Sequence, residues 1–111
     1  MRIWDIEPSK LCRNHLLGEH RELHAIWAIL TKNKKGYSRH PETLRWKGKL
    51  KALYLRHEFL VKEFEKRAYQ HKSDLQKRLA SGSVKQNKFV NSYKEQIDII
   101  KRKKCACKTS A

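Results

Sequence analysis

Apolar residues recur at helical spacing in three stretches of the chain. In the first, between Pro8 and Lys32, one apolar arc contains Leu16, Leu23, Trp27 and Leu30. Steps of three, four and seven residues bring side chains to one side of an α-helix, so this segment should pack against a core. Proline suits a first helical turn, and Pro8 with Ser9 therefore marks the start that we expect for the helix. Trp27 lies on the arc and is expected to be buried.

The second stretch carries the longest apolar stripe. Its members are Leu50, Leu53, His57, Leu60 and Phe64, and they predict a long core helix that begins near Pro41 or shortly after Trp46. Basic residues, Arg56 and Arg67 among them, supply the charge of this helix. After a break at residues 81–83, a third amphipathic helix is indicated by Val90, Tyr93, Ile97 and Ile100.

No stretch alternates convincingly between apolar and polar residues, as a half-buried strand would. We therefore expect an all-α fold, a single compact domain of three principal helices with basic loops. The domain is expected to span residues 1–104, and residues 105–111 are expected to form a flexible tail. A chain of 111 residues is long enough to bury one modest core, and we expect no second one.

The charge of the chain points to a polyanionic partner. Its 27 Lys and Arg residues outnumber 11 Asp and Glu, which gives a formal net charge of +16. Such an excess repels itself in a compact state and favours nucleic acid as the partner. Charge alone also fits a solvated basic surface or an RNA- or ribosome-associated protein. Because apolar runs such as residues 25–30 are too short for a bilayer span or a signal peptide, we expect a cytoplasmic protein without membrane contact.

Cysteine and histidine spacing gives no zinc signature. The three cysteines are Cys12, Cys105 and Cys107, an odd number without a disulfide framework, and the last two lack further ligands at zinc-site spacing. His20 and His24 are four residues apart on a predicted helix and could both reach a metal ion. Glu22 projects to the opposite side, whereas the glutamate of a zinc protease must act on the metal-bound water. We therefore expect no metal and no small-molecule cofactor.

Ionisable residues gather on one face of the first predicted helix. On a helical wheel His15, Glu19 and Glu22 lie within roughly 60° of one another, beside the apolar arc. A carboxylate at the margin of a core is partly desolvated, which raises its pKa and makes it a candidate proton donor or acceptor. From the residues alone, the alternative is an ion pair between His15 and Glu19 in which the two groups satisfy each other and have no catalytic role.

The chain starts with Met1, Arg2 and Ile3, and residues 15–23 follow the pattern H-L-x-x-E-x-R-E-L. These features resemble the pyrimidine-dimer DNA glycosylases with AP-lyase activity known from phage and bacteria. The resemblance extends more loosely to about Ser73. In that family an N-terminal α-amine attacks the deoxyribose C1′ of a damaged nucleotide and forms a Schiff base, and the strand then breaks by β-elimination.

The resemblance implies a role for each matching residue. The catalytic residues would be Met1, whose α-amine is the nucleophile, and Glu22, which stabilises the imine and moves protons at the sugar. An α-amine with a pKa near 7.7 to 8.0 is about a tenth or more free base at neutral pH, against under about 0.1% for lysine. The residues expected to contact DNA are Arg2, His15, Arg21, Lys32, Lys34, Lys35 and Arg39.

We therefore expect a monomeric DNA repair enzyme that acts on pyrimidine dimers or related base lesions in double-stranded DNA. It would combine glycosylase with AP-lyase activity. Access to C1′ inside a duplex implies a kinked DNA and an extruded nucleotide. The alternative is a non-catalytic, basic helical module that binds DNA or RNA by charge alone.

Overall fold

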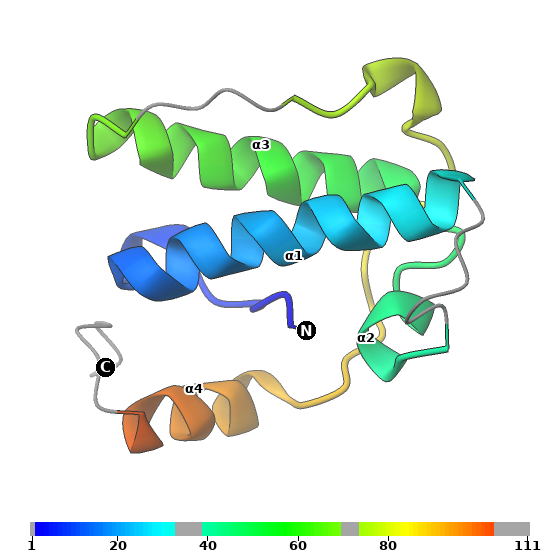
Figure 1. Ribbon diagram of the computed structural model, residues 1–111. Coiled ribbons are helices and arrows are strands. Elements are labelled where there is room, and N and C mark those ends of the chain that lie inside the picture. The colour runs from blue at the N-terminus through cyan, green and yellow to red at the C-terminus, as the bar shows by residue number, and fades with distance from the viewer. Residues whose placement is uncertain (1, 33–38, 70–73, 104–111) are drawn as a thin grey trace.

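Helices account for all the regular structure in residues 2–32, 39–69 and 74–103, which are the residues that the computed structural model describes (Figure 1). The elements are the 3₁₀ turn Pro8–Lys10, α1 at Arg13–Lys32, α2 at Pro41–Leu44, α3 at Leu50–Lys66, the 3₁₀ turn Lys77–Leu79 and α4 at Tyr93–Arg102. The all-α fold with three principal helices is thus confirmed, the three being α1, α3 and α4. The expected tail, residues 105–111, lies outside the described residues.

The first helix begins later than the sequence predicts. Pro8 opens only a 3₁₀ turn, and Leu11 after it is extended with ψ at 140°. The reason lies at the end of α3, where the C-cap residue Arg67 donates hydrogen bonds to the carbonyls of Pro8 at 3.1 Å and Leu11 at 2.6 Å. The Leu11 carbonyl, which a continuous helix would pair internally, thus finds a partner outside the segment, while the Pro8 carbonyl also accepts the Leu11 N–H of the 3₁₀ turn. The α-helix therefore starts only at Arg13.

The core lies between α1 and α3, which pack side by side and run in opposite directions (Figure 1). Leu23 and Leu53 are fully buried, and Trp27 on α1 is 6% exposed, as predicted. Further apolar side chains come from the N-terminal segment and from α4, and they include Ile3, Ile6 and Ile100. The segment before the helices is therefore part of the core.

The loop before α4 caps the N-terminus of α3. The N-cap residue Lys49 gives α3 no side-chain cap. Instead the carbonyls of Ser81 and Ser83 accept hydrogen bonds from the N–H groups of Lys51 and Ala52, at 2.8 and 3.1 Å. A side chain on Gly82, whose φ is +83°, would collide with the backbone of Gly48, so this approach requires glycine. The loop thus satisfies helix donors that would otherwise lack partners.

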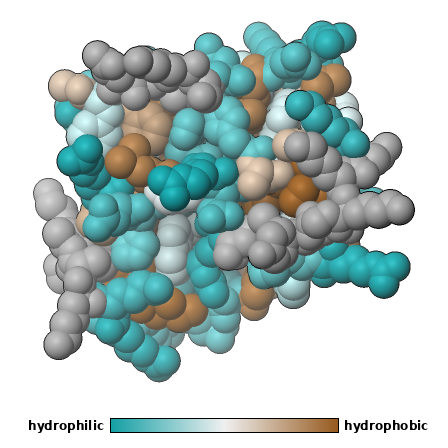
Figure 2. Space-filling view, viewed as in Figure 1, coloured by the Kyte–Doolittle hydropathy of each residue, from teal (hydrophilic) through white to brown (hydrophobic). Residues whose placement is uncertain are grey.

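The surface is largely polar on the face seen in Figure 2, where hydrophilic side chains surround small hydrophobic areas. Large apolar side chains that are about half exposed include Leu44, Leu55, Phe59 and Phe89. Within the described part of the chain, no helix combines the length and apolarity needed to cross a bilayer.

Candidate active site

Residues 2–6 run alongside α1 on the side of α4, so the start of the chain is enclosed by the fold (Figure 1). Ile3, Trp4 and Ile6 are at most 5% exposed. Three consecutive N–H groups donate to side chains of three different helices: Ile3 to Glu42 at 3.1 Å, Trp4 to Glu19 at 3.0 Å, and Asp5 to Gln96 at 2.7 Å. Because all three acceptors are buried, the segment has one well-defined path.

Three arginines bind backbone carbonyl groups of the N-terminal segment, between Ile3 and Leu11. The ion pairs that orient them, each at 2.7 Å, are Arg45 with Glu42, Arg56 with Glu19, and Arg67 with Glu63. The carbonyls they bind are that of Ile3 for Arg45, that of Ile6 for Arg56, and those of Pro8 and Leu11 for Arg67. The order of the arginines along the chain follows the order of the carbonyls. These arginine clamps, Arg45, Arg56 and Arg67, fix the segment along its length.

Arg45 is the most enclosed of the arginine clamps, with 5% exposure. Its guanidinium binds Glu42, forms a second ion pair with Asp5 at 3.1 Å, and lies over the ring of Trp46 at 4.8 Å. A buried charge is tolerated only where its donors are satisfied, and Arg45 also donates to the carbonyl of Lys88 at 3.0 Å. Arg45 therefore links the start of the chain to the loop that precedes α4.

Glu19 is the buried acid of α1 that binds the N-terminal segment. Its carboxylate accepts two hydrogen bonds from Arg56, at 2.7 and 3.0 Å, besides the one from Trp4. Burial raises the pKa of the Glu19 carboxyl, as expected for an acid at the core margin, while Arg56 and the Trp4 N–H oppose that rise. Arg56 rather than His15 is thus the ion-pair partner that accounts for this carboxylate.

Glu22 lies one helical turn after Glu19 on α1, so the two acids share a side of the helix. Glu22 is half-buried, and its neighbour Arg21 is exposed. Trp4 donates to Glu19 on this side, so the N-terminal segment is anchored to α1 one helical turn from Glu22. The structure therefore brings the predicted acid and the start of the chain to the same side of α1. The other predicted catalytic residue, Met1, lies outside the described residues.

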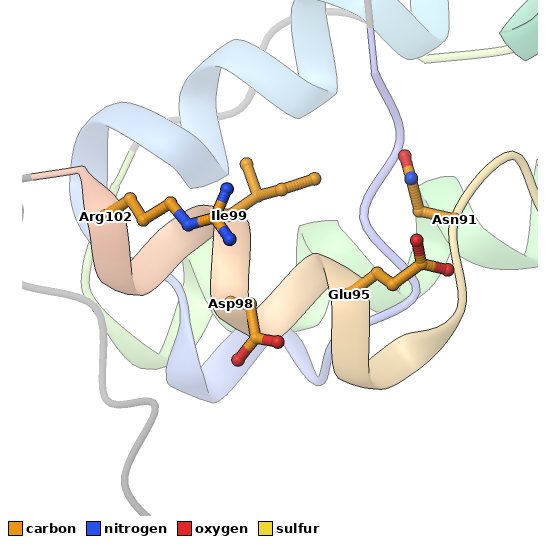
Figure 3. Close-up of a pocket in the computed structure, with 5 residues that line it drawn as sticks. All are labelled: Asn91, Glu95, Asp98, Ile99 and Arg102. Atoms are coloured by element: carbon orange, nitrogen blue, oxygen red, sulfur yellow. The ribbon is translucent and has the colours of Figure 1, made fainter.

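A cavity of about 230 Å³ opens beside the start of the chain (Figure 3). Its lining comes from α4 and the residue two positions before it: Asn91, Glu95, Asp98, Ile99 and Arg102. Arg2 donates to Asn91 at 2.8 Å, and its guanidinium lies over the Trp4 ring at 5.0 Å. Typical ligand pockets measure about 300–1,000 Å³, so this cavity is smaller than most of them.

The predicted DNA contacts differ in how far they reach into solvent. Arg21, Lys32 and Arg39 are exposed, and Arg2 and His15 are half-buried. Lys34 and Lys35 lie outside the described residues. Arg21 and Lys32 are both on α1, three turns apart, so they share a side of the helix about 16 Å apart along its axis. This arrangement suits contacts with two separate phosphates of one duplex.

His15 lies where α1 meets the N-terminal segment. Its Nδ1 is 3.2 Å from the Cys12 sulfur, and its ring meets that of Trp4 edge-on at 5.7 Å between centroids. Burial, together with the charge of Lys103, lowers the pKa of His15. The neutral imidazole is therefore favoured at this position.

The sequence pattern did not indicate the groups that hold the N-terminal segment. A signal existed for Glu63 with Arg67, because residues four apart on a helix are neighbours. Nothing comparable links Glu19 with Arg56, which are 37 positions apart. Gln96 also gave no signal, because a glutamine on an amphipathic helix is usually solvated.

The model of the pyrimidine dimer DNA glycosylase family matches residues 1–77. The chain belongs to this family. The resemblance seen in the start of the chain and in residues 15–23 is therefore confirmed, and the general function is that of a DNA glycosylase with DNA as its substrate. Comparisons with curated proteins and with solved structures found no match.

The matched part of this glycosylase contains the whole system that anchors the carbonyls of its N-terminal segment. Residues 1–77 include the three arginine clamps and the three glutamates paired with them. Two further features, the acceptor Gln96 and the cavity along α4, come after the match ends. The family core therefore holds the segment, and α4 adds the wall beside its beginning.

Proposed function

We propose that this glycosylase removes a damaged base from double-stranded DNA and then cuts the strand, using the Met1 α-amine as nucleophile and Glu22 as the residue that moves protons at the sugar. The observation that carries the proposal is the anchoring of residues 2–6 on the side of α1 that bears Glu22. Met1 is joined to Arg2 by a peptide bond. Anchoring of the residues next to a nucleophile favours reaction, because less freedom is then lost when the nucleophile meets a sugar.

The first step exchanges the base for the amine. The amine nitrogen forms a bond to C1′ while the C1′–N bond to the base breaks, and the base leaves with that electron pair and takes up a proton. Loss of a proton from the nitrogen and protonation of O4′ then open the sugar ring to an imine. An α-amine is suited to this step because a useful fraction is unprotonated at neutral pH.

The second step breaks the strand. Glu22 takes a proton from C2′, and the electron pair of that C–H bond forms the C2′=C3′ double bond while the C3′–O bond breaks. The 3′ phosphate leaves with the electron pair of the broken bond. Water then hydrolyses the imine and restores the free amine. The half-buried position of Glu22, on the side of α1 where the N-terminal segment is anchored, supports this role.

DNA binding in this proposal depends on cations of α1 and of the residues that follow it in the sequence. Arg21, Lys32, Lys34, Lys35 and Arg39 contact the phosphate backbone, while Arg2 and His15 contact the strand near the extruded nucleotide. The net charge of +16 supports non-specific scanning of the duplex. The cavity beside Arg2 receives part of the extruded nucleotide.

Borohydride trapping with a duplex that contains an abasic site tests the mechanism. Borohydride reduces an imine to a stable amine, so the wild type should form a covalent complex, and mass spectrometry of the trapped peptide should place the sugar on the N-terminal residue. A chain whose α-amine is acetylated is the matched control and should not be trapped. Undiminished trapping after acetylation would refute Met1 as the nucleophile. If the unmodified chain bound DNA without being trapped, the non-catalytic basic module would be the better description.

A further inference from the structure

Three histidines converge between α1 and α3, away from the predicted acid. His20 and His24 come from successive turns of α1, and His57 comes from the facing side of α3. Their Nε2 atoms lie 3.2, 3.2 and 3.1 Å from one another. His57 is fully buried, and the other two are partly exposed. The three rings therefore meet at a single point inside the interface of the two longest helices.

Hydrogen bonds among the rings cannot account for this arrangement. A ring nitrogen that carries a proton donates and has no lone pair left to accept, and an unprotonated one only accepts. If only one of the three Nε2 atoms carries a proton, the other two are acceptors that face each other. If two of them carry protons, those two are donors that face each other. Hence at least one of the three short contacts is unfavourable in every protonation state. A cation at the common point would satisfy all three lone pairs together.

The distances match those of a bound transition metal ion. Imidazole nitrogens lie about 2.0–2.1 Å from zinc, and two nitrogens of a tetrahedral site are then about 3.3 Å apart. We propose that His20, His24 and His57 form a zinc site that joins α1 to α3. Imidazole ligands suit zinc and its neighbours in the transition series, whereas magnesium and calcium prefer oxygen.

The outer contact of His57 supports this site. Its Nδ1 lies 3.0 Å from a carboxylate oxygen of Glu58. A proton shared between these atoms keeps Nδ1 as the donor and leaves the Nε2 lone pair directed at the metal. A carboxylate behind a histidine ligand is a recurrent feature of zinc sites and makes the ligand more basic.

A cavity of about 220 Å³ lies beside His24, and residues of α1 and of the segment around Leu75 line it as well. Among the described residues the site has three histidine ligands, and a tetrahedral zinc ion takes four. In this proposal a water molecule from the side of that cavity fills the fourth position.

The zinc site is independent of the proposed lyase chemistry. Glu22 is two residues from both His20 and His24, a rotation of about 200°, so it faces away from them. The expected role of the ion is to fasten α1 to α3. The sequence alone led us to expect no metal, because His57 is 33 positions from His24 and lies within an apolar stripe.

Titration of the untagged, full-length chain with zinc and with cobalt tests the site. The wild type should bind one equivalent of zinc, its thermal midpoint should rise with zinc concentration, and bound cobalt should show the visible absorption of a tetrahedral site. Because Cys105 and Cys107 could bind zinc by themselves, the titrations are repeated in C105S/C107S. Failure of that variant to bind one equivalent would overturn the proposal.

Single substitutions show whether the three histidines are the ligands. His24→Gln should weaken zinc binding at least about 100-fold, and Glu58→Gln about 10-fold, as loss of an outer partner typically does. His15→Asn removes a histidine elsewhere on α1 and should bind zinc like the wild type. Circular dichroism without metal verifies that each variant is folded. Unchanged zinc affinity in folded His24→Gln, or an equal loss in His15→Asn, would overturn the assignment.

Discussion

The Trp4 N–H donates to the buried carboxylate of Glu19 at 3.0 Å, and through this bond the start of the chain is held against α1. The same carboxylate neutralises Arg56, which in turn holds the carbonyl of Ile6. Glu19 thus binds an N–H group of the N-terminal segment directly, and it binds a carbonyl of the segment indirectly, through Arg56. Its loss should therefore affect stability and the position of the segment together.

We expect Glu19→Gln to lower the free energy of unfolding by about 3 kcal/mol or more, because removal of one partner leaves the mostly buried Arg56 charge uncompensated. Urea unfolding followed by circular dichroism measures the change. Glu65→Gln makes the same chemical change at an exposed position and should stay within about 0.5 kcal/mol of the wild type. Equal stability of the two variants would show that the Glu19 pair contributes little.

Glu22→Gln should reduce strand cleavage at an abasic site at least about 100-fold, because an amide cannot take the proton from C2′. Duplex affinity should change less than about twofold, since shape is kept. Gel analysis of cleavage under single-turnover conditions, with a parallel binding titration, separates the two effects. Here too Glu65→Gln is the control and should cleave normally. Normal cleavage by Glu22→Gln would leave this residue a structural role only.

Arg21→Gln should lower the slope of log affinity against log salt by about one, because one phosphate contact and its released counterion are lost. Lys32→Gln should behave in the same way, since Lys32 shares a side of α1 with Arg21. Fluorescence anisotropy of an undamaged duplex over a range of salt concentrations gives the slope. Lys62→Gln removes an exposed charge from α3 and is the control. Slopes identical to the wild type for the two α1 variants would place the DNA elsewhere.

His15 should make stability depend on pH. Because its pKa is lowered in the folded protein, its contribution is complete above the unfolded value near 6.5 and is lost as pH falls through the lowered pKa. Between pH 7.5 and pH 5, the wild type should therefore lose more unfolding free energy than His15→Asn. Urea midpoints at the two pH values measure the difference. Parallel losses in the two proteins would contradict it.

Local patterns predicted most of the fold, and long-range pairs account for what they missed. Leu23 and Trp27 correctly marked α1, and Ile97 with Ile100 marked α4, because helical periodicity is a local property. The true start of α1 could not be predicted, since it depends on Arg67 more than fifty positions away.

The candidate site was likewise predictable where its residues lie on one helix, and not where they come from two. The spacing of residues 15–23 pointed to Glu22 and to the family, because these positions lie on one helix. The pair of Glu19 with Arg56, and the meeting of His57 with His24, require two helices to be placed side by side. No periodicity within one segment carries that information.

The acceptor for the Asp5 N–H, Gln96, lies 91 positions further along the chain. Contacts at such sequence separation form slowly, so this bond should form late in folding. A chain in which α1, α2 and α3 have already packed can hold the carbonyls of the N-terminal segment through the arginine clamps, but the Asp5 N–H still lacks its acceptor. The docking of α4 is therefore expected to complete the backbone hydrogen bonding of residues 3–5 as the last step.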